Sequence, residues 1–297
     1  MSAPEFLIKG DKVAIIATAR KVSAEEISNS VKILETWGLK VSFGKNLFKA
    51  HHQFAGTDER RAEDLQQMLD DEKIKAVFCA RGGYGTVRII DELNFRKFIA
   101  KPKWLVGYSD ITVLHSHVFS NFQIPSIHGT MPINFPKNTK ESLESLRRAL
   151  FGETVIHSFP GHKLNRKGSA EGIIVGGNLS LIQSLLGTKS DLDTRNKILF
   201  FEDLDEYLYH IDRMMMQLKR SGKLKFLKAL IVGGMTKLKD NQVPFGKSAE
   251  EIILEKTAEF SYPVCFGFPA GHIDDNRAFY LGKKAKLTVG NSVSLTY

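Results

Sequence analysis

Short apolar runs alternate with amphipathic stretches along the first half of the chain. Each run has the length of a buried strand, and the stretches between them have helical periodicity. The runs are residues 12–17, 41–43, 76–80 and 104–106. Strands that alternate with helices in this way predict right-handed βαβ units, and therefore a parallel, doubly wound α/β sheet.

Local signals place the helices between these runs. Ser23 and Glu26 have capping-box spacing, so we expect a helix that begins there and that Gly38 ends. An acidic and basic stretch after Thr57 has a helical pattern as well. The further predicted helices are residues 58–70, residues 87–93 and a segment from Asp110 onward.

The second half of the chain has a different pattern. Residues 136–168 are polar and charged, with one short amphipathic helix, and we interpret them as a linker behind a boundary at Phe135. One clear helix is predicted for residues 205–221. The predicted domains are therefore residues 1–135 and a smaller one, residues 169–297. Strands in the second domain are expected at residues 172–179, 198–201, 229–232 and 286–289.

Composition narrows the class of protein. With 42% hydrophobic and 25% charged residues, the 297-residue chain is an ordinary globular one. Cys79 and Cys265 are far apart in sequence, which favours a reducing compartment over a disulfide framework. The chain lacks a signal-peptide pattern and any apolar run of roughly 18 residues, so we expect a cytoplasmic protein. The net charge of +9 is compatible with acidic partners and says nothing about chemistry.

A serine stands where the run at 104–106 meets the next predicted helix, in Gly107-Tyr-Ser-Asp110. A sharp strand-to-helix turn exposes a serine hydroxyl and aims helix N–H groups at a developing oxyanion. Gly107 leaves room for such a turn, whereas Ile111 replaces the second glycine of the usual G-x-S-x-G pattern. Ser109 is therefore either a nucleophile or a helix cap.

A serine nucleophile needs a histidine base and a carboxylate that orients the imidazole. His272 lies in a segment rich in loop-forming residues. Glu202 and Asp203 follow an apolar strand, at the end where open α/β sheets gather functional groups. Ser109, Glu202 and His272 would give the order nucleophile, acid, base. The alternatives are an exposed loop histidine and a carboxylate at a helix N-terminus.

The glycine cluster Arg81-Gly-Gly-Tyr-Gly85 can present backbone N–H groups to an anion or an oxyanion. It lacks the Lys-Ser/Thr ending of a Walker A loop and does not match G-x-G-x-x-G, which disfavours nucleotide binding. Arg81, whose guanidinium can bind a carboxylate in bidentate fashion, and Tyr84 beside it are the substrate-binding candidates. A structural role of Arg81 within the loop is the alternative.

Other reactive residues fit structural roles better. Val77 and Arg81 flank Cys79 at positions where a nucleophile turn needs small residues, so Cys79 is interpreted as a buried strand cysteine. None of the nine histidines forms H-E-x-x-H, and two cysteines cannot build a thiolate zinc site. We therefore expect no metal and no cofactor.

Taken together, several segments resemble one family, the serine LD-carboxypeptidases, which include the microcin C immunity peptidases. Each segment is weak alone, but the set follows the family's order and spans nearly the whole chain. Departures occur at Ala17-Thr-Ala-Arg20, where Ala-Pro-Ser is more usual, and at Thr130, where Pro is common. The matching segments are residues 10–13, 79–85, 107–112, 128–131, 176–180, 199–203, 209–213, 268–272 and 276–282.

The resemblance implies a fold and a mechanism. The fold is an N-terminal flavodoxin-like or amidotransferase-like parallel-sheet domain with a C-terminal swivelling β/α domain, usually in a homodimer. Ser109 is implied as nucleophile, Glu202 as triad acid and His272 as general base, with an oxyanion hole from the backbone N–H groups of Asp110 and Gly83. The implied substrate is a murein tetrapeptide. Its terminal D-alanine is released from the L-centre of a diamino acid during cytoplasmic peptidoglycan recycling.

Two alternatives remain. A same-family enzyme could inactivate a peptidyl-nucleotide of the microcin C type, although the compact chain favours murein. A basic nucleic-acid-binding module is the alternative of another class, because residues 211–240 hold eight Lys and Arg against two Asp. The chain lacks a recognised nucleic-acid module, so we expect neither nucleic-acid nor membrane partners.

Overall fold

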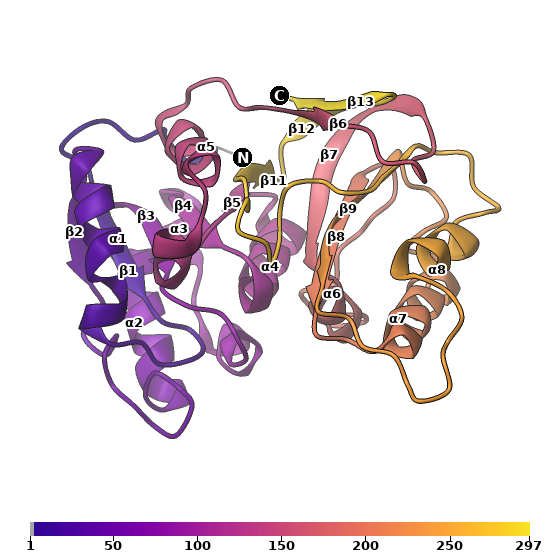
Figure 1. Cartoon of the computed structure of the whole chain (residues 1–297). Coiled ribbons are helices and arrows are strands. Elements are labelled where there is room, and N and C mark those ends of the chain that lie inside the picture. Colours follow the sequence, from indigo (N-terminus) through magenta and orange to yellow (C-terminus); the bar gives the residue numbers. More distant parts are fainter. Residues whose placement is uncertain (1–2) are drawn as a thin grey trace.

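Two β-sheets lie side by side, and the N-terminal half of the chain builds most of the first (Figure 1). The computed structural model describes residues 3–297. The first sheet has the order β11-β5-β4-β3-β1-β2, and its strands β1 to β5 are parallel. This 2-1-3-4-5 order is that of flavodoxin-like folds and confirms the predicted parallel sheet. The strands are β1 (Lys12–Ile16), β2 (Lys40–Phe43), β3 (Ile74–Cys79), β4 (Trp104–Gly107), β5 (Ser126–His128) and β11 (Phe279–Leu281).

Helices cover both faces of the first sheet, which is why its inner strands are apolar on both sides. On one face lie α1 (Ala24–Thr36) and α5 (Lys140–Phe151). The other face carries α2 (Asp58–Asp70), α3 (Arg96–Ala100) and α4 (Thr112–Phe122). The predicted capping box begins α1, because the Ser23 hydroxyl accepts the backbone N–H of Glu26 and the Glu26 carboxylate accepts that of Ser23.

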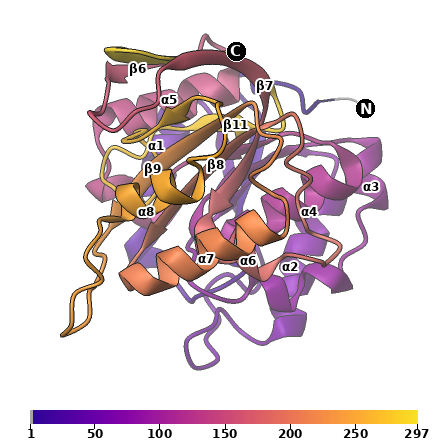
Figure 2. The same cartoon turned by 90° about the vertical axis from the view of Figure 1, so that its right-hand side faces the viewer.

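The second sheet is mixed, with the order β10-β9-β8-β7-β12-β13-β6. Strands β7 to β10 are parallel, and β12, β13 and β6 are antiparallel. The helices α6 (Leu179–Ser184), α7 (Leu208–Arg220) and α8 (Ala249–Lys256) pack on one face and lie in front of the sheet in Figure 2. The strands are β6 (Ile156–Pro160), β7 (Gly168–Asn178), β8 (Ile198–Leu204), β9 (Ala229–Thr236), β10 (Val264–Cys265), β12 (Lys284–Val289) and β13 (Ser292–Thr296).

The chain crosses between the two sheets more than once. Residues 136–168, predicted as a linker, contain α5, which packs on the first sheet, and β6, which is an edge strand of the second. Near the C-terminus, β11 returns to the first sheet and pairs antiparallel with β5. The predicted boundaries at 135 and 168 stay a prediction, but the segment between them contributes secondary structure to both halves.

The helix predicted for residues 87–93 is wrong. The segment instead forms two 3₁₀ turns, Thr86–Arg88 and Ile90–Glu92. Ile89 and Ile90, where the two turns meet, are both buried. In addition, the buried Asp110 carboxylate accepts the N–H at the start of the first turn and holds the backbone there.

The helix predicted for residues 205–221 begins later than expected. Asp205 has a φ of 61°, which a right-handed helix does not accept, so α7 begins only at Leu208. Its predicted last residue, Ser221, directly follows the observed last residue, Arg220. Within residues 3–297, no helix has the length and apolarity that a membrane span requires.

Candidate active site

A cavity of about 550 Å³ opens at the carboxyl ends of β1, β3 and β4, the edge at which open α/β sheets place binding groups. The end of β8 and the loop that follows β10 close it from the second sheet. Five predicted residues line this cavity, and they come from both sheets. They are Arg81, Gly83, Tyr84, Ser109 and His272.

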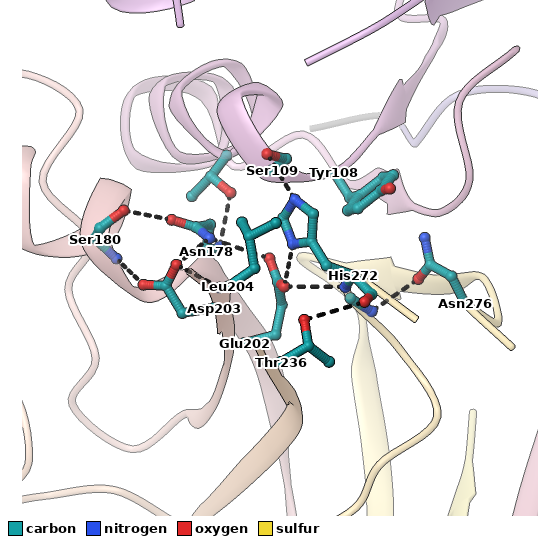
Figure 3. A network of polar contacts seen from close by, with 12 residues as sticks. Tyr108, Ser109, Asn178, Ser180, Glu202, Asp203, Leu204, Thr236, His272 and Asn276 are labelled. Atoms are coloured by element: carbon teal, nitrogen blue, oxygen red, sulfur yellow. Dashed lines mark hydrogen bonds and ion pairs between the residues drawn. The ribbon is translucent and has the colours of Figure 1, made fainter. Parts of the chain in front are cut away.

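Ser109 occupies a strained turn directly after β4. Its φ is 62°, in the left-handed region that residues other than glycine seldom adopt. Gly107 must be glycine here, because a Cβ would lie 2.8 Å from Cγ1 of Ile111. The Ser109 hydroxyl points to His272 (Figure 3), so the helix-cap alternative does not describe it.

Three side chains from distant parts of the sequence form one hydrogen-bonded row (Figure 3). Oγ of Ser109 lies 3.1 Å from Nε2 of His272, and Nδ1 of the same ring lies 2.6 Å from Oε2 of Glu202. Glu202 is fully buried inside β8, and the His272 side chain is only 15% exposed. Neither the exposed-loop histidine nor the helix-terminal carboxylate is therefore what the structure contains. Such a row is able to pass a proton from the hydroxyl to the imidazole.

Close backbone approach brings the His272 loop against β8. Gly271 has a φ of 110°, and a Cβ there would lie 2.7 Å from the side chain of Glu202. The N–H of Gly271 donates to Oδ1 of Asn276 at 2.9 Å, and the Thr236 hydroxyl donates to the carbonyl of His272 at 3.2 Å. These bonds hold the loop on both sides of the histidine, so its ring meets the carboxylate directly.

The electrostatic surroundings favour a protonated imidazole. Burial lowers the pKa of His272, but the charge of Glu202 and the hydrogen bond to it outweigh burial, so the pKa rises above its usual value. Asp203 is also buried, and burial together with the neighbouring Glu202 charge raises the pKa of Asp203 to about 7. The edge of the His272 ring packs against the ring of Tyr108, with centroids 4.9 Å apart. An imidazolium formed here is stabilised by the carboxylates behind it.

A buried polar network supports the loop of residues 81–85. The guanidinium of Arg61 is buried and donates from Nη1 to the carbonyls of Thr18 and Gly85. Oδ2 of Asp110 accepts the N–H of Thr86 at 2.9 Å and its hydroxyl at 2.6 Å. Since Asp110 directly follows the candidate nucleophile, the glycine loop and the nucleophile turn share one scaffold.

The two central glycines of that loop face different neighbours. A Cβ on Gly82 would lie 3.3 Å from Oγ of Ser109, whereas a Cβ on Gly83 would lie 2.6 Å from Cδ of Arg20. Gly82 is thus the glycine that lies against the Ser109 side chain. The backbone N–H groups of Gly83 and Asp110 stay predicted oxyanion donors.

Charges of opposite sign line the two sides of the cavity. Arg20 and Arg81 come from loops of the first sheet, and Lys137 ends the 3₁₀ helix Pro132–Lys137. Asp205 and Glu206 follow β8 of the second sheet. Outside the cavity lining, Lys239 pairs with Asp205 at 2.7 Å, and Nδ1 of His210 lies 2.7 Å from Oε2 of Glu206. The cavity therefore offers its free positive charge on the first-sheet side, which suits a substrate that carries carboxylates.

Arg81 and Tyr84 have few contacts within the protein. The guanidinium of Arg81 reaches the carbonyl of Lys21 only at 3.4 Å, and it lies 3.9 Å from Glu26. Tyr84 is 47% exposed, and its ring packs loosely on Phe54. Both side chains are therefore available to a ligand in the cavity.

Residues that the sequence assigned to structural roles are buried. Burial raises the pKa of the Cys79 thiol to about 12, so it is not a thiolate at neutral pH. Burial lowers the pKa of His115 to about 4, and this ring contacts the carbonyl of Gly107. Among residues 3–297, no three His, Cys, Asp or Glu side chains gather into a group that could hold a metal ion.

Sequence reasoning missed several residues around the site. Arg20 and Lys137 line the cavity, and Asn178 lies 3.4 Å from Glu202 through its Nδ2. Arg20 follows the end of β1, so the same strand-end rule that singled out Glu202 could have found it. For Arg61, which is buried behind the glycine loop, no signal distinguishes it from the other charges of its helix.

Two family models match the chain, one over residues 13–129 and one over residues 171–287. The first describes the N-terminal domain and the second the C-terminal domain of LD-carboxypeptidases. The chain belongs to the LD-carboxypeptidase family. The predicted family and enzyme class, a serine LD-carboxypeptidase, are thereby confirmed.

Relatives of similar length carry carboxypeptidase names. The chain is 36% identical to a probable murein peptide carboxypeptidase of Bacillus subtilis (strain 168), over 98% of this chain and 93% of that protein. It is 33% identical to the murein tetrapeptide carboxypeptidase of Pseudomonas aeruginosa, over 93% and 92% of the two chains.

Solved structures share the whole architecture. The muramoyltetrapeptide carboxypeptidase from Oxalobacter formigenes superimposes with a TM-score of 0.88 at 28% identity, covering 96% of this chain and 97% of that chain. The microcin C7 self immunity protein MccF, in complex with aspartyl sulfamoyl adenosine, also has a TM-score of 0.88, covering 100% of this chain and 98% of that one. At 22% identity the MccF match concerns the fold alone. The predicted two-domain α/β architecture is confirmed.

Proposed function

We propose that this LD-carboxypeptidase releases the terminal D-alanine of murein tetrapeptides, with Ser109, His272 and Glu202 as its catalytic triad. The observation that carries the proposal is the hydrogen-bonded row of these three side chains at the cavity. The names of the Pseudomonas and Oxalobacter relatives support a murein tetrapeptide as substrate. A homodimer that acts in cytoplasmic peptidoglycan recycling belongs to the same proposal.

The reaction proceeds by acyl transfer. The His272 tautomer that donates from Nδ1 to Glu202 leaves Nε2 free to take the Ser109 proton as Oγ attacks the amide carbonyl. The same proton then passes from Nε2 to the leaving amine of D-alanine, and an acyl-enzyme remains. Water, deprotonated by the imidazole, attacks the ester carbon, and the proton returns to Oγ as the tripeptide leaves.

Backbone donors and basic side chains complete the site. The N–H groups of Asp110 and Gly83 hold the oxyanion of the tetrahedral intermediate. A carboxypeptidase must recognise a free terminal carboxylate, and Arg81 can bind it in bidentate fashion, with Tyr84 beside it. The contact of Arg81 with the carbonyl of Lys21 is long at 3.4 Å, so little is lost when the guanidinium turns to substrate.

Replacing the nucleophile tests the proposal directly. Ser109→Ala should lower kcat for the conversion of tetrapeptide to tripeptide by at least about 10³-fold and leave the fold intact. Ser116→Ala is the matched control, because it removes a buried hydroxyl that has no hydrogen-bond partner and should keep full activity. Product release is followed by chromatography, and Tm by circular dichroism. Near-normal hydrolysis by S109A would contradict the triad.

Hydrolysis of a peptidyl-nucleotide is the second candidate function. It is favoured by the MccF structure, which shares the fold and whose complex contains aspartyl sulfamoyl adenosine. In this chain the free basic side chains at the cavity favour a substrate rich in carboxylates. Comparing kcat/KM for a murein tetrapeptide with that for an aspartyl sulfamoyl adenosine decides between them, and a higher value for the second compound would reverse the assignment.

The basic segment 211–240 does not present all its charge to a partner. Lys219 pairs with Glu259 at 2.9 Å, Lys223 with Asp191 at 2.7 Å and Lys239 with Asp205 at 2.7 Å. These ion pairs support a solvated protein surface over a nucleic-acid site. Backbone binding to nucleic acid would show a steep inverse dependence of affinity on salt, which filter binding measures.

A further inference from the structure

Asp203 is a buried carboxylate for which the proposed reaction has no role. It follows Glu202 in β8, and its side chain turns to the other side of the strand (Figure 3). Three N–H groups satisfy it: Nδ2 of Asn178 at 2.9 Å, the backbone of Ser180 at 2.9 Å and the backbone of Leu204 at 2.8 Å. A carboxylate so fully paired is held in one orientation.

The partner of Asp203, Asn178, contacts both halves of the site. Its Nδ2 lies 3.4 Å from Oε1 of Glu202, the triad carboxylate. Its backbone N–H donates to Oγ1 of Thr112 at 2.9 Å, and Thr112 begins α4, the helix that leads away from Ser109. Asn178 therefore connects β8, which carries Glu202, to α4, the helix that follows Ser109.

The chemistry of Asp203 decides which end of the Asn178 amide faces Glu202. An ionised carboxylate only accepts hydrogen bonds, so the NH₂ group of Asn178 must turn toward it. The amide oxygen then accepts the hydroxyl of Ser180 at 2.7 Å. The backbone N–H of Leu181 also donates to this oxygen, at 3.3 Å. Without the carboxylate, the NH₂ group of Asn178 loses its nearer acceptor, and an amide turned the other way would place its oxygen against Glu202, where two acceptors repel each other.

We propose that Asp203 is a positioning residue of the triad. It orients the Asn178 amide so that an N–H faces Glu202. The backbone N–H of Asn178 in turn binds Thr112 at the start of α4, so that Glu202 and Ser109 keep their positions relative to each other across the two sheets. This inference rests on the proposed function, in which Glu202 orients His272. Groups that hold a functional side chain from behind typically change activity by about 10–100-fold when they are removed.

Asp203 also acts on His272 through its charge. Three charged groups act on the imidazole: Glu202 and Asp203 raise the pKa of His272, and Lys237 lowers it. Burial together with the Glu202 charge raises the pKa of Asp203 itself to about 7, so its full charge acts on the imidazole only above about pH 7. Removing that charge should lower the pKa of His272.

The first test is Asp203→Asn on the full-length protein with a murein tetrapeptide. We expect kcat to fall by about 10–100-fold, KM to stay within about twofold, and the acidic limb of the kcat profile to move to lower pH. Asp64→Asn is the matched control, since Asp64 is equally buried and accepts both the backbone and side-chain N–H groups of Asn46. D64N should lower Tm and leave kcat and the pH profile unchanged.

The second test exchanges the pair, Asn178→Asp with Asp203→Asn. The exchange restores a hydrogen bond between the two positions but places a carboxylate oxygen, not an N–H, toward Glu202. Because this oxygen and Glu202 repel each other inside the protein, we expect neither kcat nor Tm to recover relative to D203N. If D203N does not fold, the kcat of the exchanged variant alone tests the proposal. A kcat of D203N within about twofold of wild type, or recovery of kcat together with Tm in the exchanged variant, overturns the proposal.

A readout without substrate separates this inference from the proposed function. The Nδ1 proton of His272, in its 2.6 Å bond to Glu202, should give a downfield proton NMR resonance that moves in D203N and stays in D64N. An unchanged resonance in D203N counts against the positioning role. If the wild type hydrolyses no tetrapeptide, the proposed function fails, and the NMR comparison still tests Asp203.

Discussion

Replacing Gly271 by alanine should separate His272 from Glu202 without touching either side chain. Gly271 has a φ of 110°, and an added Cβ would lie 2.7 Å from Cβ, Cγ and Oε2 of Glu202. Two of these atoms belong to the root of a fully buried side chain, which has no space into which to move. The loop must therefore shift, and it carries the imidazole with it.

The magnitude follows from two contributions. A residue other than glycine in a sparsely populated region of φ costs about 1–3 kcal/mol. Inserting a methyl group into a well-packed site costs about 1–3 kcal/mol more. The sum of roughly 2–6 kcal/mol is relieved if the loop moves and the 2.6 Å bond of His272 to Glu202 breaks. Since about 1.4 kcal/mol is a factor of ten in rate, the lower end of this range predicts a fall in kcat of at least about 30-fold.

Gly267→Ala provides the matched control in the same segment. Gly267 has a φ of 72°, but nothing lies within 4 Å of its added Cβ, so this variant carries the backbone strain without the overlap. We expect kcat near wild type and a small loss of Tm, measured by tetrapeptide turnover and thermal melting. The reasoning fails if folded G271A keeps wild-type kcat, or if G267A loses as much activity as G271A.

Two further predictions concern pH and the support of the glycine loop. Since Glu202 raises the pKa of His272 despite burial, activity should fall on acidification from above about pH 6.5, and Glu202→Gln should move that limb to lower pH. Because the folded state binds the His272 proton more tightly than the unfolded state, this proton stabilises the fold below about pH 6.5, and the stabilisation is lost as the pH rises through the raised pKa. Melting curves recorded at several pH values would measure this. A contribution to stability that grows with rising pH would refute it. Arg61→Met leaves the Gly85 carbonyl without its donor, so the unfolding free energy should fall by about 1–3 kcal/mol and kcat should fall as well. Arg60→Met, at an exposed position, should change neither quantity. Equal melting curves of the two variants would contradict the role of Arg61.

Much of the first sheet could be predicted because its strands are buried on both faces. Such strands are continuous apolar runs, and their polar boundaries predict where each strand ends. The residues at those ends, among them Ser109 and the glycine cluster, were for this reason recognisable as candidates. The bounds of 3₁₀ turns and of α7 were not recognisable, since Asp110 and Asp205 act there through a distant hydrogen bond and an unusual φ.

The candidate triad was likewise predictable from the sequence only in part. Residue type and strand ends singled out Ser109, Glu202 and His272, and the structure places them within 3.1 Å and 2.6 Å of one another. Their catalytic roles stay a prediction that S109A tests. Asn178 and Arg61 went unrecognised, because an amide and a guanidinium acquire their importance only from the groups that the fold packs around them.

What the sequence determined by itself is local: the capped α1, the apolar strands, the turn with Gly107 and the ordered segments of the LD-carboxypeptidase family. The tertiary structure alone decided that β11 returns to the first sheet, that residues 136–168 contribute to both sheets, and that Gly271 lets His272 approach Glu202. The physical reason is the separation along the chain over which each kind of interaction acts. Periodicity and capping involve neighbours within a few residues, whereas the side-chain contacts of His272 with Glu202 and Ser109 join residues 70 and 163 positions apart.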